Sequence, residues 1–329
     1  MKTLILATAA TVLLAAAAQA QTTMRVAHQF PPTHYMALAL DGWAEEIETK
    51  SNGQIDVQMF PAAQAFKPNQ VFPAVARGQV EAGFQVSFQW GNTLPDMGAL
   101  TIPFILSGVE RGKAFIGSEA ADLLDEELTA KGVHNLMWIF LGNANLVSSN
   151  GKPLIHVADF EGVKMRGGGK IFDSGFVAAA AATKPESKIM PASEVYQALD
   201  TGIVDAASGD FIGSFARKYY EVQEYGTVNG LNCVFGQMIS NPAWWNGLSE
   251  ENRAIVDAAS ANLETRLFDD YQENYEAAYA QMKDRMKLHI QTDDEAAEWE
   301  SFMKPAGKKV FLDEGSPNGE KLVELLEKL

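Results

Sequence analysis

Arg166 is the residue whose type and setting point most directly to chemistry with a ligand. It ends the expected strand 163–166 and is followed by three glycines and an expected helix. Ligands of open α/β sheets bind beyond the carboxyl ends of strands, where a guanidinium can hold a carboxylate through two parallel hydrogen bonds. We therefore expect Arg166 to bind a carboxylate, the alternative being an ion pair with a structural Asp or Glu.

Signatures of catalysis and metal binding are missing. The five histidines are scattered, and none forms a His-Glu-x-x-His pair or lies near a second ligand at metal spacing. Neither a Gly-x-Ser-x-Gly turn nor an EF-hand loop occurs. Gly167-Gly-Gly-Lys170 resembles a phosphate loop only superficially, because Ile171 stands where Ser or Thr is required. We expect a binding protein without cofactor or metal, not an enzyme.

The N-terminus predicts export. Lys2 precedes an apolar run over residues 4–18, and Ala18-Gln19-Ala20 has the small-x-small form of a signal-peptidase site. The run is short for a membrane span, and residue 21 is Gln, so the cleavage point has no cysteine to carry a lipid. We expect residues 1–20 to be a signal peptide and the mature chain to lie free in the periplasm, with no direct membrane insertion.

The charge and length of the chain limit the architecture and the classes of partner that we expect. The chain has 329 residues, so about 309 remain after removal of residues 1–20 (329 − 20), enough for two lobes with their own cores. The formal charge of −16 becomes −17 without Lys2, which argues against nucleic acid as a partner. The single cysteine, Cys233, lies in an apolar stretch and is expected to be a buried thiol.

A helix-to-strand pattern occurs twice, at residues 71–83 and 195–207, with five of thirteen positions identical. Each copy predicts a helix end, a left-handed glycine cap (Gly78 or Gly202) and a short strand. Together with the β-α-β-α-β pattern of the first hundred residues, it predicts an α/β fold with two similar lobes, each a mostly parallel sheet flanked by helices. Chance similarity between two such joints is the alternative.

If both strands end at a cleft between the lobes, the residues after them line that cleft. One set is 85–90, the other 208–211. We expect Trp90 and Phe211 to form apolar walls, and Gln85 and Asp210 to make polar contacts. Each of these four assignments rests on weak evidence by itself, because an aromatic residue after a strand usually belongs to the core.

We expect the first lobe to comprise residues 21–143 plus about 235–255, and the second residues 144–234, with a crossing near Asn143–Lys152. A four-residue apolar repeat predicts a long helix over about 250–288 that bridges the lobes. Two consecutive helices with a bend are the alternative. Residues 289–329 are expected to form C-terminal helices that pack on the lobes.

Motifs along nearly the whole mature chain resemble the extracytoplasmic solute-binding proteins of tripartite ATP-independent periplasmic (TRAP) transporters, of the C4-dicarboxylate-binding (DctP) type. The matching motifs are Met24-Arg-Val-Ala-His28, Gly53-Gln-Ile-Asp-Val57, Phe60-Pro-Ala62, Ile102-Pro-Phe104, Lys152-Pro153, Asp159-Phe-Glu-Gly-Val-Lys-Met-Arg166, Met190-Pro-Ala-Ser-Glu-Val-Tyr-Gln-Ala-Leu-Asp-Thr-Gly-Ile-Val-Asp205 and Lys218-Tyr-Tyr-Glu-Val222. The resemblance implies two lobes that close over a small organic acid, with Arg166 bound to its carboxylate. It also implies delivery to a small and a large integral membrane subunit.

The chain departs from that family at several positions. Many relatives carry a second arginine within the stretch that corresponds to residues 142–147, where this chain has Asn145, expected to act as a neutral donor. Ala192 replaces a common aromatic residue. With one arginine, the hypothesis is a monocarboxylate or a zwitterion, and Asp210 faces its cationic or hydroxyl group. Gln29, after the first strand, completes the expected binding residues.

Two alternatives remain open at this point. One is a solute receptor for an ATP-driven importer, which has similar lobes and a different membrane partner. The other is a periplasmic enzyme, for which turnover of a bound ligand would be required.

Overall fold

The computed structural model describes residues 21–143, 145–167, 169–179 and 187–329. The expected signal peptide, residues 1–20, lies outside the described residues, as do Gly168 and the end of the alanine-rich segment, 180–186. Over the described part of the chain, no helix is both long enough and apolar enough to cross a membrane.

The first lobe is built on a sheet with the strand order β2-β1-β3-β10-β4. Its strands are β1 (Thr22–Ala27), β2 (Ile55–Phe60), β3 (Ala82–Val86), β4 (His134–Gly142) and β10 (Val234–Ser240). β1 is parallel to β2 and β3, which confirms the expected β-α-β-α-β opening. β10 is antiparallel to β3 and β4, so the sheet is mixed.

The second lobe is built on a sheet with the order β11-β9-β5-β8-β6-β7. Its strands are β5 (Asn145–Ser149), β6 (Met165–Gly167), β7 (Ser187–Ile189), β8 (Ala206–Asp210), β9 (Tyr225–Asn229) and β11 (Lys287–Ile290). Parallel pairs flank β5, which is antiparallel to both β8 and β9. Two mixed sheets flanked by helices form the two-lobed α/β fold expected from the sequence.

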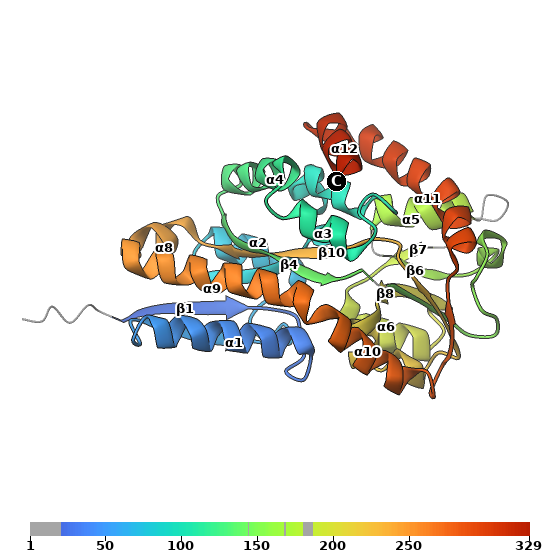
Figure 1. Ribbon diagram of the computed structural model, residues 1–329, viewed down its shortest axis with the longest axis horizontal. Helices are drawn as coiled ribbons and strands as arrows, with labels where there is room; N and C mark the ends of the chain where they lie inside the picture. The colour runs from blue at the N-terminus through green and yellow to red at the C-terminus, as the bar shows by residue number, and fades with distance from the viewer. Residues whose placement is uncertain (1–20, 144, 168, 180–186) are drawn as a thin grey trace, which may run out of the picture.

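The helices cover both sheets, and Figure 1 shows their arrangement. They are α1 (Tyr35–Lys50), α2 (Pro68–Ala76), α3 (Val109–Phe115), α4 (Glu119–Ala130), α5 (Lys170–Ala179), α6 (Ala192–Asp200), α7 (Phe211–Ala216), α8 (Pro242–Gly247), α9 (Glu250–Asp269), α10 (Tyr271–Met282), α11 (Asp293–Asp313) and α12 (Gly319–Lys328). Short 3-10 turns include residues 87–89, 91–93 and 95–101.

The two copies of the sequence repeat occupy equivalent places. The first forms the end of α2 and β3, and the second forms α6 and β8. Gly78 and Gly202 cap these helices with φ angles of 70° and 69°, as predicted. Each strand has a parallel neighbour on one side, β1 or β6, and an antiparallel neighbour on the other, β10 or β5. The repeat therefore marks one structural unit used in both lobes.

Two adjacent strand-to-strand crossings join the lobes. The chain passes from β4 to β5 after Gly142 and returns from β9 to β10 after Asn229. Gly142 is paired with Val234 in the first sheet, and Asn145 with Asn229 in the second. The crossing lies at the start of the polar stretch expected to contain it, and the rest of that stretch includes β5.

The single long helix expected over about 250–288 is wrong, and the alternative of two helices with a bend holds. α9 and α10 meet at Asp270 and follow one another across both lobes (Figure 1). The direction changes because α9 packs on α1 and β4 of the first lobe, whereas α10 packs on α7 of the second. The helix ends at Met282, since residues 287–290 pair with β9 as strand β11.

The C-terminal helices pack on both lobes. α11 lies along α5, and α12 lies against α4. The expected C-terminal helical region therefore begins later than residue 289, because His289 and Ile290 belong to β11. Cys233 is buried in the core of the first lobe, and burial raises the pKa of its thiol to about 12. The prediction of an inert buried thiol agrees with this environment.

Candidate functional site

A cavity lies where the two sheets meet, beside the crossings. Its volume is about 110 Å³, several times the space that one water molecule needs. The first lobe contributes Gln29, Phe30, His34, Val86, Ser87, Phe88, Leu100, Thr101, Leu141, Val234 and Phe235, and the second contributes Asn145, Arg166, Phe172, Ala192, Ser208, Gly209, Asp210, Ser214, Arg217 and Tyr219, while Asn232 and Cys233 come from the returning crossing. Apolar walls with a few polar groups are typical of small-molecule sites.

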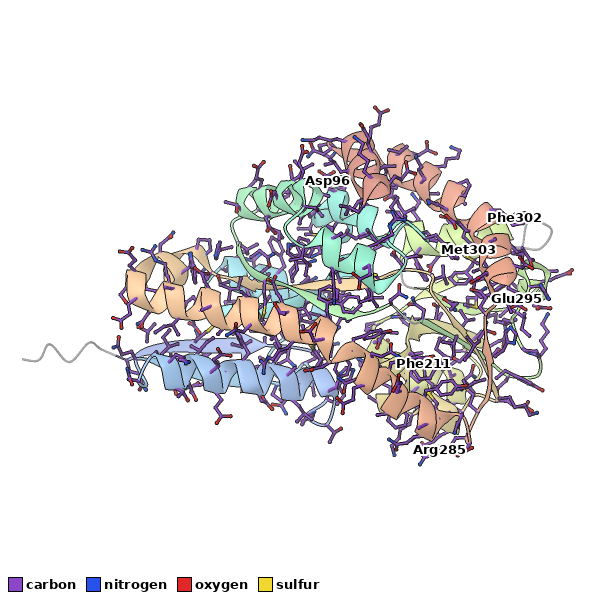
Figure 2. All side chains as sticks on the ribbon, in the orientation of Figure 1. Asp96, Phe211, Arg285, Glu295, Phe302 and Met303 are labelled. Atoms are coloured by element: carbon purple, nitrogen blue, oxygen red, sulfur yellow. The ribbon has the colours of Figure 1, made fainter. Side chains whose placement is uncertain are left out.

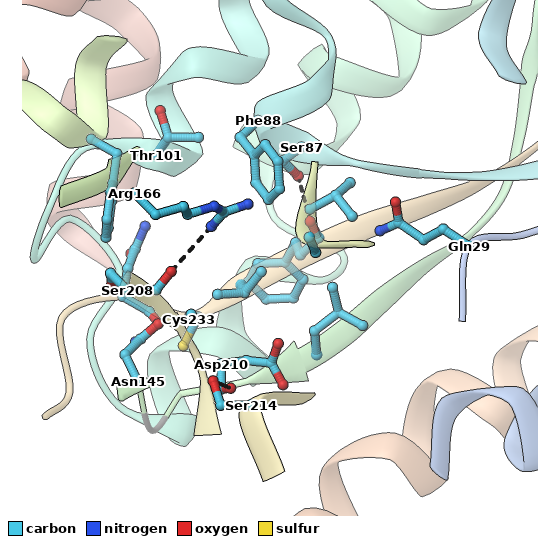
Figure 3. A pocket seen from close by; sticks show the side chains of 18 of the residues that line it. Gln29, Ser87, Phe88, Thr101, Asn145, Arg166, Ser208, Asp210, Ser214 and Cys233 are labelled. Carbon is cyan, nitrogen blue, oxygen red and sulfur yellow. Dashed lines mark hydrogen bonds between the residues drawn. The ribbon is translucent and has the colours of Figure 1, made fainter. Parts of the chain in front are cut away.

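Arg166 projects from β6 into this cavity with only 7% of its surface exposed. Its Nη1 donates to the carbonyl of Ser208 (3.1 Å) and its Nη2 to that of Met190 (3.0 Å), as Figure 3 shows for the first bond. Its buried Nε has no partner, and no carboxylate lies within 4.0 Å of the guanidinium in the described part of the chain. The alternative of a structural ion pair therefore does not hold for the described residues.

Burial lowers the pKa of Arg166, opposed by Tyr219, Asp173 and Asp210 at longer range. An arginine nevertheless stays charged in a protein. Two carbonyl dipoles fix the orientation of this cation without cancelling its charge, and an uncompensated buried charge is unfavourable. The site is therefore prepared for an anion.

Two charged side chains line the cavity from the ends of α7, Asp210 at its start and Arg217 at its end. Both make hydrogen bonds to the backbone of Gly213. Asp210 caps α7, with Oδ1 accepting from the N–H of Gly213 at 2.5 Å, and Arg217 Nη1 donates to the Gly213 carbonyl at 3.1 Å. A Cβ at residue 213 would crowd the carboxylate of Asp210 and stand 2.7 Å from Arg217 Nη1, so a larger residue there would displace both charged groups. Burial raises the pKa of Asp210, opposed by Arg217.

Arg217 corrects the expectation of a single arginine at the site. The stretch 142–147 has none, but α7 brings a second guanidinium to the cleft from a different part of the chain. No carboxylate lies within 4.0 Å of it among the described residues. The charged groups of the lining are therefore Arg166, Arg217 and Asp210, since burial lowers the pKa of His34 to about 3 and keeps that ring neutral.

Gln29 turns a hydrogen-bond donor toward the cavity because its neighbours fix its amide. Gln89 Oε1 accepts from the N–H of Val86 (3.1 Å), and Gln89 Nε2 donates to Gln29 Oε1 (2.9 Å). The Gln29 nitrogen is left facing the cavity, on the other side from Arg166 in Figure 3. Gln89 thus positions Gln29.

Asn145 lies at the cavity, but it is not the free donor expected from the sequence. Its Nδ2 donates to the carbonyls of Asn143 (3.0 Å) and Asn232 (2.9 Å), which uses both N–H groups. The side-chain oxygen makes no hydrogen bond within the described residues. Asn145 therefore presents an acceptor, because the paired crossings supply carbonyls on its nitrogen side.

Gln85, Trp90 and Phe211 do not line the cavity. Successive strand residues point to opposite faces, so Val86 faces the cavity and Gln85 faces away. Trp90 is buried in the first lobe, where its Nε1 donates to Gln237 at 2.7 Å. Phe211 is fully buried, with its ring centroid 5.0 Å from that of Tyr275 on α10 (Figure 2). These three expectations were wrong because the side chains are buried elsewhere in the fold.

Arg217 was not predicted from the sequence, and Ser87 and Phe88 were included only as members of the segment 85–90. Ser87 and Phe88 lie inside the segment that the repeat indicated, but their direction depends on the 3-10 turn after β3. Arg217 directly precedes the matching motif at 218–222, which was the one available signal. Groups of three or more His, Cys, Asp or Glu that could hold a metal ion are not found within the described residues.

Fold and site together define a two-lobed α/β solute-binding protein with its ligand cavity between the lobes. The family model of the bacterial extracellular solute-binding proteins, family 7 (DctP), matches residues 26–314, and the chain belongs to this family. The chain is thus a receptor of the TRAP type, and neither a receptor for an ATP-driven importer nor an enzyme is supported.

Individual relatives agree with this assignment. The chain is 30% identical to the C4-dicarboxylate-binding periplasmic protein DctP of Rhodobacter capsulatus over 79% of this chain and 78% of that protein. A TRAP solute-binding protein of Desulfovibrio salexigens, solved with orotic acid, superposes with a TM-score of 0.85 at 22% identity over 93% of this chain and 97% of that one. One from a Sulfitobacter species, with β-D-galacturonate, gives 0.85 at 20% identity over 94% and 100%.

Proposed function

We propose that this chain binds a small organic acid between its lobes and delivers it to a TRAP permease made of a small and a large integral membrane subunit. The observation that carries the proposal is Arg166, a buried cation held by two carbonyls with no carboxylate within 4.0 Å among the described residues. A carboxylate entering the cavity would supply the missing counter-charge and a partner for Nε.

The named relatives support a carboxylate ligand. C4-dicarboxylates, orotic acid and galacturonate differ in size and shape, but each carries a carboxylate. Because those proteins are distant, we carry over the shared functional group and not the rest of the ligand. Gln29 Nε2 and Asn145 Oδ1 would contact the remainder.

Asp210 bears on the ligand class. Burial raises the pKa of Asp210, and the nearby cations Arg217 and Arg166 oppose that rise. The sequence-based hypothesis of a monocarboxylate or zwitterion therefore keeps its acceptor at Asp210, but it no longer rests on the absence of a second arginine. We propose that Asp210 accepts a hydrogen bond from a hydroxyl or ammonium group of the ligand.

We propose a periplasmic location with cleavage before Gln21. Strand β1 begins at Thr22, directly after that point, which supports a mature chain that starts near Gln21. We also retain the lobe boundaries expected above as a proposal, with α9 and α10 in place of one bridging helix.

The test is Arg166→Ala, with Arg77→Ala as the control because Arg77 is exposed at the end of α2. A screen of organic acids by thermal shift identifies ligands, since a compound that binds only the folded state raises Tm. For every such acid we expect Arg166→Ala to weaken binding by about 2 kcal/mol or more, roughly thirtyfold in Kd.

The ligand-free Arg166→Ala variant should unfold at no lower temperature than the wild type, because the substitution removes an uncompensated buried charge. Full retention of affinity in this variant would overturn the proposal. Loss of affinity in Arg77→Ala as well would show a general charge effect, which would also count against it.

A further inference from the structure

A second cavity of about 260 Å³ adjoins the first at the junction of the lobes. Gln29, Ala192 and Arg217 line both cavities, so these three side chains form the boundary between them. The other lining residues are Pro31, Ala62, Ala63 and Pro68 of the first lobe with Ser193 and Tyr196 of the second. We call this second cavity the side chamber.

The boundary is polar on two sides and small on the third. Arg217 uses only Nη1 to donate to the carbonyl of Gly213, and Gln29 uses only its side-chain oxygen, which accepts from Gln89. Both side chains therefore keep N–H groups that can donate to a ligand. Ala192 contributes only a methyl group. The smallest side chain of the boundary is therefore that of Ala192, and Arg217 and Gln29 offer hydrogen-bond donors beside it.

The first-lobe rim of the side chamber is held in an unusual conformation. Ala62 and Ala63 have φ angles of 52° and 57°, in the left-handed region that disfavours residues with a Cβ. Their N–H groups donate to the carbonyls of Phe30 (2.9 Å) and His28 (3.0 Å), which fixes this turn against the end of β1. Conformations of this kind cluster at ligand-binding sites, where the surrounding structure maintains them.

The second-lobe wall begins α6. Ala192 and Ser193 are its first residues, and the preceding Pro191 offers no side-chain cap. The uncapped N–H groups of this nine-residue helix add positive potential beside Arg217. The side chamber thus joins a guanidinium, an amide donor and a helix start around small apolar side chains.

We propose that the two cavities form one elongated site, in which the ligand carboxylate binds Arg166 and an oxygen-bearing far end binds Arg217 and Gln29 in the side chamber. Ala192 sets the permitted length. The inference rests on the proposed function, because it takes the Arg166 end as given. It names the substrate class as elongated acids with an acceptor group at the far end.

The experiment uses linear α,ω-dicarboxylates from succinate to suberate and the monocarboxylates of equal length, measured by calorimetry on the mature wild type and three variants. Ala192→Phe closes the boundary, and Ala243→Phe is its control, since Ala243 is exposed in the first turn of α8. Arg217→Gln removes the charge at the boundary and keeps a hydrogen-bond donor.

Wild type should bind the longer dicarboxylates more tightly than succinate. Ala192→Phe should weaken the longest ones about tenfold more than it weakens succinate, because only the long acids must pass residue 192. Arg217→Gln should weaken each dicarboxylate more than the monocarboxylate of equal length, because only the former has an anionic far end. Ala243→Phe should change neither.

Equal effects of Ala192→Phe on short and long acids would overturn the inference, as would a wild type that binds none of the series. The experiments distinguish a failure of this inference from a failure of the proposed function. If Arg166→Ala loses all binding while Ala192→Phe shows no dependence on length, the carboxylate site stands and the elongated site does not. If Arg166→Ala keeps full affinity, both fail.

Discussion

Arg166 of the second lobe faces the ring of Phe88 of the first lobe, with the guanidinium carbon 5.9 Å from the ring centroid. Figure 3 shows the two side chains next to one another at the cavity. The contact crosses the cleft, so it forms only when the lobes are close together. A cation over an aromatic face is stabilised by the ring quadrupole, more strongly where water is excluded.

Phe88→Leu should therefore weaken ligand binding without abolishing it. Leucine keeps an apolar wall but lacks the ring, and loss of a cation–π contact of about 0.5–1.4 kcal/mol corresponds to roughly a two- to tenfold rise in Kd. Calorimetry with any acid found in the screen measures this. Phe302→Leu is the matched control, because Phe302 is 46% exposed on α11. An unchanged Kd for Phe88→Leu would show that the contact does not contribute.

Gln89 should control binding through Gln29, although it is not among the residues that line the cavity. Gln89→Glu still accepts from Val86, but it can no longer donate to Gln29 Oε1. The Gln29 amide should then turn over, and its oxygen would face the anionic ligand. We expect a loss of about tenfold in affinity.

Gln89→Leu separates this effect from simple disruption, because it leaves the Gln29 amide free to choose its orientation. Its loss of affinity should be smaller than that of Gln89→Glu. Equal losses in the two variants would contradict the positioning role. Tm of the ligand-free proteins shows whether either variant disturbs the fold.

Two partly buried carboxylates in the first lobe should make stability fall with rising pH. Burial raises the pKa of Glu264 from 4.5 to about 7, and nearby Asp125 adds to the rise, while the N–H of Trp138 opposes it at 2.7 Å. Between pH 4.5 and about 7, Glu264 loses its proton in the unfolded chain but keeps it in the folded chain. The free energy of unfolding therefore decreases as pH increases. Burial likewise raises the pKa of Asp125 to about 6.

Glu264→Gln keeps the acceptor for Trp138 and removes the charge. At pH above about 7 it should be more stable than wild type by roughly 1 to 3 kcal/mol, with little difference below the ordinary carboxyl range. Urea unfolding across this range tests the prediction, and the exposed Glu276→Gln serves as control. A difference that did not depend on pH would mean that another interaction is responsible.

Gly202 should be required for its left-handed conformation and not for space. Its φ is 69°, and a Cβ there would meet no atom within 4 Å. Gly202→Ala should lower the free energy of unfolding by about 1–2 kcal/mol, whereas Gly202→Asn should cost less because asparagine tolerates this region. Chemical denaturation compares the two. If both variants matched the wild type, the cap would not contribute to stability.

The sequence determined those parts of the fold that depend on neighbouring residues. Apolar periodicity and glycine caps gave the helices and strands of both repeat copies, because these patterns act over a few residues. Arg166 could be placed at the cleft because the end of a strand before glycines has a fixed relation to the sheet. The segments after β3 and β8 were located for the same reason.

Only the tertiary structure decided which side chains in those segments reach the ligand. Val86 and Phe88 line the cavity, while Gln85 and Trp90 do not, because strand register and the turn after β3 set their directions. Arg217 enters the site through the close approach of α7 to Gly213, and α9 separates from α10 because each packs on a different lobe. These outcomes depend on contacts between residues far apart in the chain, and such contacts cannot be predicted from a pattern of neighbouring residues.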